Sequence, residues 1–167
     1  HIAYVPQDVF LFSDTLAENI AFGLAEGEAT DEKILAAAMM AGLGRDIAQF
    51  PLGLKTMLGE RGVLLSGGQK QRVSIARALI KEAELYIFDD CLSAVDADTE
   101  REIIQSLTQK LQGKTAIIIS HRLASLQEAN QIILLEEGKI AESGTFTELI
   151  RAGGSFSELY QLQSSTS

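Results

Sequence analysis

Cysteine is almost absent from this sequence of 167 residues, and Cys91 is its single example. One cysteine excludes a disulfide within the chain and any zinc site built from several cysteines. We therefore expect Cys91 to be a small, buried or half-buried side chain rather than a reactive thiol.

Runs of basic residues are also missing. The chain has 14 lysines and arginines against 23 aspartates and glutamates, which gives a formal net charge of −9. Proteins that bind the phosphate backbone of nucleic acids rely on clustered Lys and Arg side chains. The composition therefore argues against a partner of that kind.

Long apolar runs are absent as well. No stretch reaches the length of a transmembrane helix, and the chain does not open with a signal peptide. We therefore expect a soluble, intracellular chain with no direct membrane insertion, so that any membrane role comes through a partner or a further part of the polypeptide. The length and the 46% hydrophobic content suit one globular domain.

The most informative stretch is LSGGQ at residues 65–69, which runs into a helical spacing of apolar residues over 70–80. Ser66 is a favoured N-cap, and two glycines after it let the backbone approach a ligand closely. The N–H groups and the dipole at a helix start favour an anion. Taken alone, the stretch is as compatible with an ordinary capped helix after a glycine-rich turn.

Further motifs in the right order remove most of that ambiguity. Together with LSGGQ they resemble the nucleotide-binding domain of ATP-binding cassette (ABC) transporters of the exporter type, and the resemblance covers nearly the whole chain. The matching segments are the Q-loop at Gln7, the exporter X-loop at 59–62, Walker B at 85–90, the D-loop at 93–96 and the switch histidine His121.

The resemblance implies an ATP hydrolase that uses ATP and Mg²⁺. It implies that Asp89 and Gln7 hold the metal, which suits a cation that prefers oxygen ligands. It assigns Asp90 as the general base and His121 as the residue on the γ-phosphate, so that Asp90, His121 and Gln7 form the catalytic set.

The resemblance also implies a partner. In this family two nucleotide-binding domains pair head to tail, and the signature of one faces the ATP held by the other. The residues implied to bind nucleotide at this junction are Ser66, Gly67, Gly68, Gln69 and Asp96. A transmembrane domain of the same transporter is the second implied partner, which places the chain at the cytoplasmic face of the plasma (inner) membrane.

Asp90 is the main departure from the family pattern, because the family usually has Glu at this position. An Asp carboxylate lies one methylene further back, and a displaced base can cost orders of magnitude in rate. Two interpretations stay open: the weakened-site half of a heterodimeric exporter, and a homodimer in which Asp90 suffices.

The family's Walker A sequence, G-x-x-x-x-G-K-[ST], does not occur in the chain, which begins six residues before Gln7. A decoy at Gly113-Lys114-Thr115 fails because a helix precedes it and a strand follows, the reverse of a phosphate loop. We therefore expect this 167-residue chain alone to bind ATP weakly and to be inactive as an ATPase.

The expected fold class is α/β: a partial P-loop NTPase (RecA-like) core with a mainly parallel sheet, plus an inserted all-α subdomain that carries the signature. The expected division is 1–12 for a core strand and the Q-loop, 13–82 for the helical subdomain, and 83–167 for the rest of the core. Buried strands are expected at 2–5, 85–88 and 115–120, with a hairpin over 131–143. Helices are expected at 15–22, 30–41, 44–50, 97–111, 146–151 and 156–162, besides the signature helix, and a short helix or turn is expected at 125–129.

Two rival functions remain. A soluble ABC ATPase of DNA repair or chromosome maintenance is disfavoured by the charge of −9 and by the exporter-like segment at 59–62. A non-catalytic interaction fragment that only retains the fold is supported for this piece by the missing Walker A, whereas the full order of the other motifs indicates that the parent polypeptide is an enzyme. The sequence names no transported substrate.

Overall fold

The computed structural model describes residues 2–25, 27–59 and 63–165. It consists of two compact units, His1–Ile119 and Ser120–Ser167, and each is described by itself. The predicted division at residues 12 and 82 follows the motifs rather than these units, and it stays a prediction.

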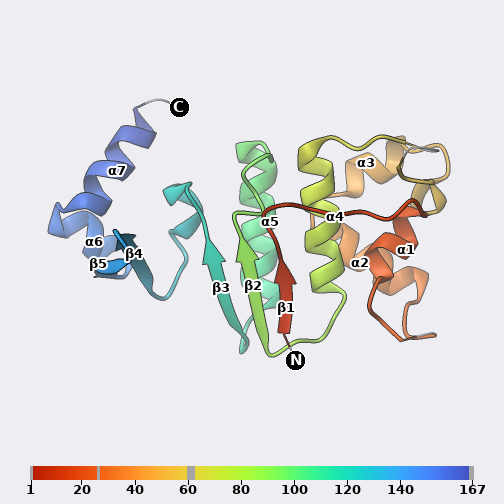
Figure 1. Ribbon diagram of the computed structural model, residues 1–167, viewed down its shortest axis with the longest axis horizontal. Helices are drawn as coiled ribbons and strands as arrows, with labels where there is room; N and C mark the ends of the chain where they lie inside the picture. The colour runs from red at the N-terminus through yellow and green to blue at the C-terminus, as the bar shows by residue number, and fades with distance from the viewer. Residues whose placement is uncertain (1, 26, 60–62, 166–167) are drawn as a thin grey trace. The chain divides into compact units, whose positions relative to one another are not determined.

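A parallel sheet organises the first unit. Its strands are β1 (Ile2–Val5), β2 (Leu85–Asp89) and β3 (Thr115–Ile119), in the order β1-β2-β3. The strand that precedes Gln7 therefore lies beside the strand that ends in Asp89, although about eighty residues separate them in sequence (Figure 1). The predicted parallel sheet, with residues 85–88 as its central strand, is confirmed.

The prediction that residues 2–5 and 115–120 form buried strands is wrong for one face of the sheet. Side chains alternate along a strand, and those of Ile2, Tyr4, Ile117 and Ile119 are about half exposed or more. The opposite face is covered at β1, where Val5 is fully buried, but on β3 Ala116 of that face is exposed and Ile118 is only half-buried. The prediction assumed a parallel sheet covered on both faces.

Helices make up the rest of the first unit, and polar caps start most of them. Thr15, Thr30, Ser66 and Asp96 each accept a hydrogen bond from the backbone N–H three residues further on. The helices are α1 (Leu16–Ala21), α2 (Asp31–Met40), α3 (Gly44–Gln49), the 3₁₀ turn η1 (Gly53–Lys55), α4 (Gly67–Leu79) and α5 (Ala97–Lys110).

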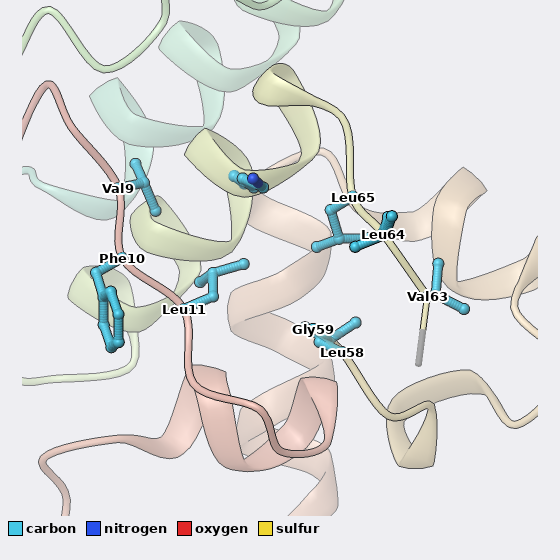
Figure 2. A pocket seen from close by; sticks show the side chains of 9 residues that line it. Val9, Phe10, Leu11, Leu58, Gly59, Val63, Leu64 and Leu65 are labelled. Atoms are coloured by element: carbon cyan, nitrogen blue, oxygen red, sulfur yellow. The ribbon is translucent and has the colours of Figure 1, made fainter. Parts of the chain in front are cut away.

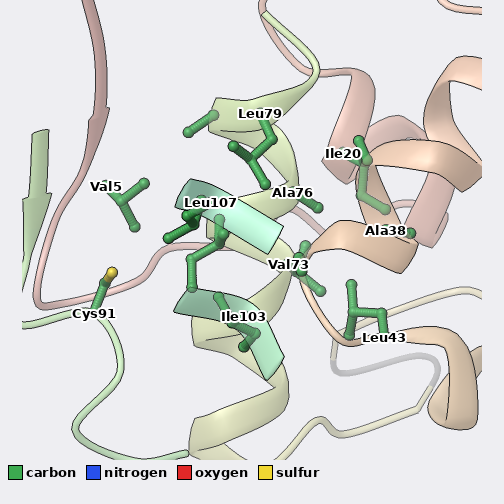
Figure 3. Close-up of a cluster of buried hydrophobic side chains, with 14 of the residues drawn as sticks. Val5, Ile20, Ala38, Leu43, Val73, Ala76, Leu79, Cys91, Ile103 and Leu107 are labelled. Atoms are coloured by element: carbon green, nitrogen blue, oxygen red, sulfur yellow. The ribbon is translucent and has the colours of Figure 1, made fainter. Parts of the chain in front are cut away.

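Helix α4 lies at the centre of the unit, between the sheet and the smaller helices α1 and α2 (Figure 1). Its apolar side chains, among them Val73 and Ala76, are fully buried. Figure 3 shows them among side chains from the sheet, from α2 and from α5, such as Val5, Ala38 and Ile103. The helix that starts at the LSGGQ stretch is therefore part of the main core.

The second unit is a hairpin with helices. Its elements are η2 (Leu123–Leu126), β4 (Ile132–Glu136), β5 (Lys139–Gly144), α6 (Phe146–Ala152) and α7 (Ser155–Ser164). The hairpin is confirmed, and its two-residue turn places Glu137 and Gly138 at positive φ, as a type I′ turn requires. The short helix or turn expected at 125–129 is found as a 3₁₀ turn that begins two residues earlier.

None of the helices that the structure describes has the length and apolar character needed to span a bilayer. The longest helix named above, α5, is amphipathic and packs its Ile103, Ile104 and Leu107 side chains into the core of the first unit.

The burial of Cys91 leads to the first prediction. The side chain is 3% exposed, and its burial raises the pKa of the thiol to about 12. Because the thiolate is the reactive form, we expect iodoacetamide to leave native Cys91 unmodified at pH 8 and to alkylate it in 6 M guanidinium chloride. Mass spectrometry measures both states, and rapid alkylation of the native chain would contradict this buried position.

Candidate functional site

Three predicted site residues lie together where β1 and β2 end. Gln7 follows β1, Asp89 closes β2, and Asp90 comes next. The Gln7 side-chain amide donates to Asp90 Oδ2 at 3.4 Å. Carboxyl ends of parallel strands meet at one edge of a sheet, which is where open α/β folds place their ligands. The structure thus brings Gln7, Asp89 and Asp90 together at this edge, and their predicted roles stay predictions.

Tyr4 is a polar neighbour that the sequence analysis missed. Its hydroxyl donates to Asp89 Oδ2 at 3.0 Å from the exposed face of β1. This hydrogen bond raises the pKa of the Tyr4 phenol, because ionisation would remove the shared proton beside a carboxylate. Strand alternation could have placed Tyr4 on the open face, but its pairing with Asp89 depends on the register of β1 against β2.

The backbone of Asp90 is held in an uncommon conformation. Its φ is +45°, a region that Asp and Asn visit more readily than most residues. The Asp90 N–H donates to Ile119 O at 2.9 Å, and the Asp90 carbonyl accepts from Ser93 Oγ at 2.9 Å. The backbone of Asp90, from which its carboxylate projects, is therefore held by the end of β3 and by Ser93 in the loop that follows Asp90.

The oxygen atoms at this edge suit a magnesium ion. Mg²⁺ is usually bound by one or two carboxylates together with substrate phosphates, and the edge offers Asp89 and Asp90 with the amide oxygen of Gln7. No group of three or more His, Cys, Asp or Glu side chains able to hold a metal occurs in the part of the chain that the structure describes. The donor chemistry therefore fits a metal that a phosphate ligand completes, not a cage built by the protein alone.

The LSGGQ stretch forms a capping box at the start of α4. Ser66 Oγ accepts from the Gln69 N–H at 3.2 Å, and Gln69 Oε1 accepts from the Ser66 N–H at 2.8 Å. Within the described residues, no hydrogen bond uses the N–H groups of Gly67 or Gly68. These two N–H groups, at the positive end of a long helix, are the donors that an anion could use.

The side chain of Gln69 is occupied by structural contacts. Besides the capping bond, its amide donates to Asp46 Oδ1 at 2.7 Å, and Arg72 donates to Asp46 Oδ2 at 2.6 Å. The Arg72–Asp46 pair is largely buried. Gln69 is thus placed to hold α4 in position, and its predicted nucleotide contact stays a prediction. No sequence signal marked Asp46, because it lies 23 residues from Gln69.

The loop that contains the predicted D-loop packs under the start of α4. A Cβ placed on Gly68 would lie 2.7 Å from Ala94 O, whereas one on Gly67 would come only within 3.5 Å of Ala94 Cβ. Gly68 is therefore required by protein packing, a reason that the sequence analysis did not give. Asp96 ends the loop and caps α5, and the N–H of Thr99 holds the pKa of its carboxyl below the ordinary value.

Arg77, near the end of α4, binds the segment that follows Gln7. Its guanidinium donates to Asn19 O at 2.8 Å and to Phe10 O at 3.1 Å, and it lies over the rings of Phe12 and Phe22. Burial lowers the pKa of Arg77. The sequence analysis did not single out this contact.

A pocket of about 210 Å³ opens beside the same segment. Figure 2 shows residues 9–11 on one side of it and residues 58–59 and 63–65 on the other. Its lining is apolar except for Lys70, and the neighbouring Phe10 ring is 68% exposed. The predicted X-loop residues 60–62 lie outside the described residues.

His121 belongs to the second unit and lies at its start. Its carbonyl accepts from Gln163 Nε2 at 2.7 Å, and the side chain is exposed. Gln163 also accepts from the N–H of Leu123, so α7 fixes the backbone around this histidine. The predicted role of His121 on a phosphate stays a prediction.

Comparison with known proteins identifies the family. Residues 1–93 match the family described as ABC transporter. Over 162 residues the chain is 46% identical to the ATP-dependent lipid A-core flippase of Shewanella sp. strain MR-4 and 49% identical to the multidrug resistance-like ATP-binding protein MdlA of Escherichia coli K12. The chain belongs to the ABC transporter family, and the resemblance seen in its motifs is confirmed.

A solved structure agrees with this assignment. The chain superposes on a bacterial Atm1-family ABC exporter with ATP bound, with a TM-score of 0.90 and 39% identity over 98% of its length. The match confirms the predicted α/β, P-loop NTPase-like fold class. The chain spans 28% of that exporter and 27% of each of the two curated relatives named above.

The two glycines of the signature provide a matched test. We expect Gly68→Ala to destabilise the chain by about 1–3 kcal/mol, because the new methyl group must displace the backbone of Ala94. Gly67→Ala, where the methyl group meets only an ordinary contact, should change stability by less than about 1 kcal/mol. Urea unfolding measures both variants, and equal effects would contradict the packing of α4 on Ala94.

Proposed function

We propose that this chain is part of the nucleotide-binding domain of an ABC exporter, which couples binding and hydrolysis of ATP to transport across a membrane. The observation that carries the proposal is the grouping of Gln7, Asp89 and Asp90 at the carboxyl edge of the sheet. Family membership supports it, as do relatives named as a flippase, a multidrug resistance-like protein and an ATP-bound exporter.

At this edge each side chain has a distinct task. Asp89 and Gln7 would hold a magnesium ion, which would neutralise charge on the phosphates of ATP. Asp90 accepts a hydrogen bond from the attacking water and orients it toward the γ-phosphate. The Gln7 amide, already within 3.4 Å of Asp90, keeps the base beside the metal ligands. From the resemblance of its motif alone, His121 is proposed to contact a γ-phosphate.

The signature residues serve a second nucleotide. In a head-to-tail pair of nucleotide-binding domains, the N–H groups of Gly67 and Gly68 and the hydroxyl of Ser66 donate to the γ-phosphate of ATP held by the partner. Gln69 keeps these donors in place through the capping box. Asp96, exposed at the start of α5, lies at the junction between the two domains.

The second proposed partner is a transmembrane domain of the same transporter. Phe10, Phe12 and Phe22 expose 68%, 36% and 51% of their surface within one aromatic cluster. Phe10 also lines the pocket formed by residues 9–11, 58–59, 63–65 and Lys70. An apolar segment of the transmembrane domain fits such a surface, which would place this chain at the cytoplasmic face of the membrane.

The test is ATP hydrolysis by the full-length transporter. We expect Asp90→Asn to lower the rate of phosphate release by at least about a hundredfold, because an amide cannot act as the base. Asp90→Glu should keep or raise the rate. Asp98→Asn is the matched control, since Asp98 is exposed on α5 and only pairs with Arg101, and it should stay within about twofold.

The same measurement separates the two forms of the dimer. If the wild-type protein hydrolyses ATP alone, a homodimer with a working Asp90 is supported. If it needs a second half-transporter and Asp90→Glu raises the rate strongly, the weakened half of a heterodimer is supported. Unchanged hydrolysis in Asp90→Asn would contradict the assignment of Asp90 as the base.

A further inference from the structure

Gln71 is a buried polar side chain that the proposed function does not use. It lies in α4, two residues after the signature, and is 6% exposed. Its amide nitrogen donates to Ser93 Oγ at 3.1 Å, and its amide oxygen accepts from the Ala94 N–H at 2.9 Å. Both ends of the amide therefore bind one loop, which follows β2.

Ser93, in that loop, also forms a hydrogen bond with Asp90, the proposed general base. Ser93 Oγ accepts from Gln71 and donates to the carbonyl oxygen of Asp90 at 2.9 Å. The N–H of Asp90 is held on its other side by Ile119. Two side chains thus connect α4 to the backbone of Asp90, whose positive φ needs support from its surroundings.

Packing makes the connection stiff. Gly68 and Gln71 are three residues apart, so they lie on the same face of α4. Gly68 brings the helix backbone against Ala94 O, and Gln71 binds the N–H of the same residue. The loop is therefore held by close packing at one turn of the helix and by hydrogen bonds at the next.

We propose that Gln71 is a positioning residue, which couples the signature end of α4 to Asp90 through Ser93. The inference rests on the proposed function. In a head-to-tail dimer the signature of this chain meets the partner's ATP, while Asp90 acts on the ATP held by this chain. Gln71 would then transmit the state of one nucleotide site to the base of the other.

The first experiment is steady-state hydrolysis of Mg–ATP by the full-length transporter. Gln71→Leu keeps the size of the side chain and removes both hydrogen bonds. We expect kcat to fall about tenfold to a hundredfold with KM for ATP within about threefold, because the base is displaced while the nucleotide contacts remain. Gln105→Leu, on the exposed face of α5, is the control and should leave both constants within about twofold.

Ser93→Ala is the second variant. It removes the bond to Asp90 from an exposed position, so it should fold normally. We expect it to lower kcat in the same way, and the double variant to be no slower than the slower single one, because both act through one connection. A kcat within twofold of wild type for both single variants, or an effect confined to KM, would overturn the proposal.

Amide hydrogen exchange without nucleotide tests the connection independently of hydrolysis. Gln71→Leu should speed amide exchange at Ala94 at least about tenfold, because the Ala94 N–H loses the Gln71 oxygen that accepts its hydrogen bond. Gln105→Leu should leave exchange at Ala94 unchanged. If the wild-type protein hydrolyses no ATP even with a second half-transporter, the proposed function fails, and this measurement still decides whether Gln71 holds the loop. Unchanged exchange at Ala94 would overturn the inference.

Discussion

The close approach of α4 to the loop at 93–95 is the constraint on which the site depends. It is possible only because Gly68 has no side chain at the point where Ala94 O lies. The loop begins at Asp90, the residue after the end of the central strand, and ends at Asp96, which caps α5. One contact between a glycine and a carbonyl thus fixes the signature turn relative to the carboxylates at the sheet edge.

The helix that carries this contact is held from other sides as well. Gln69 and Arg72 bind Asp46, and Arg77 binds the backbone of the segment after Gln7. The buried Arg72–Asp46 pair fixes orientation rather than adding much net stability, as buried ion pairs seldom do. A phosphate at the exposed glycine N–H groups would therefore act on a helix that contacts both the Gln7 segment and the Asp90 loop.

Local signals predicted most of the elements, because caps, glycine stops and apolar periodicity act within a few residues. Ser66 is predicted as a cap on that basis, and the order of motifs places Asp89 and Asp90 at a strand end. The contacts of Asp46 and Gln71 could not be predicted, since their partners lie 22 to 26 residues away and no local pattern marks them. The exposure of β3 was missed because its apolar sequence cannot say which face the helices cover.

The most direct measurement is a structure of the full-length protein, with Asp90→Asn to slow hydrolysis, in the presence of ATP and Mg²⁺. The account predicts two nucleotides between paired domains, with Ser66 Oγ and the Gly68 N–H of one chain within hydrogen-bond distance of the γ-phosphate that the other chain holds. Nucleotide bound with the start of α4 directed away from any phosphate would contradict it.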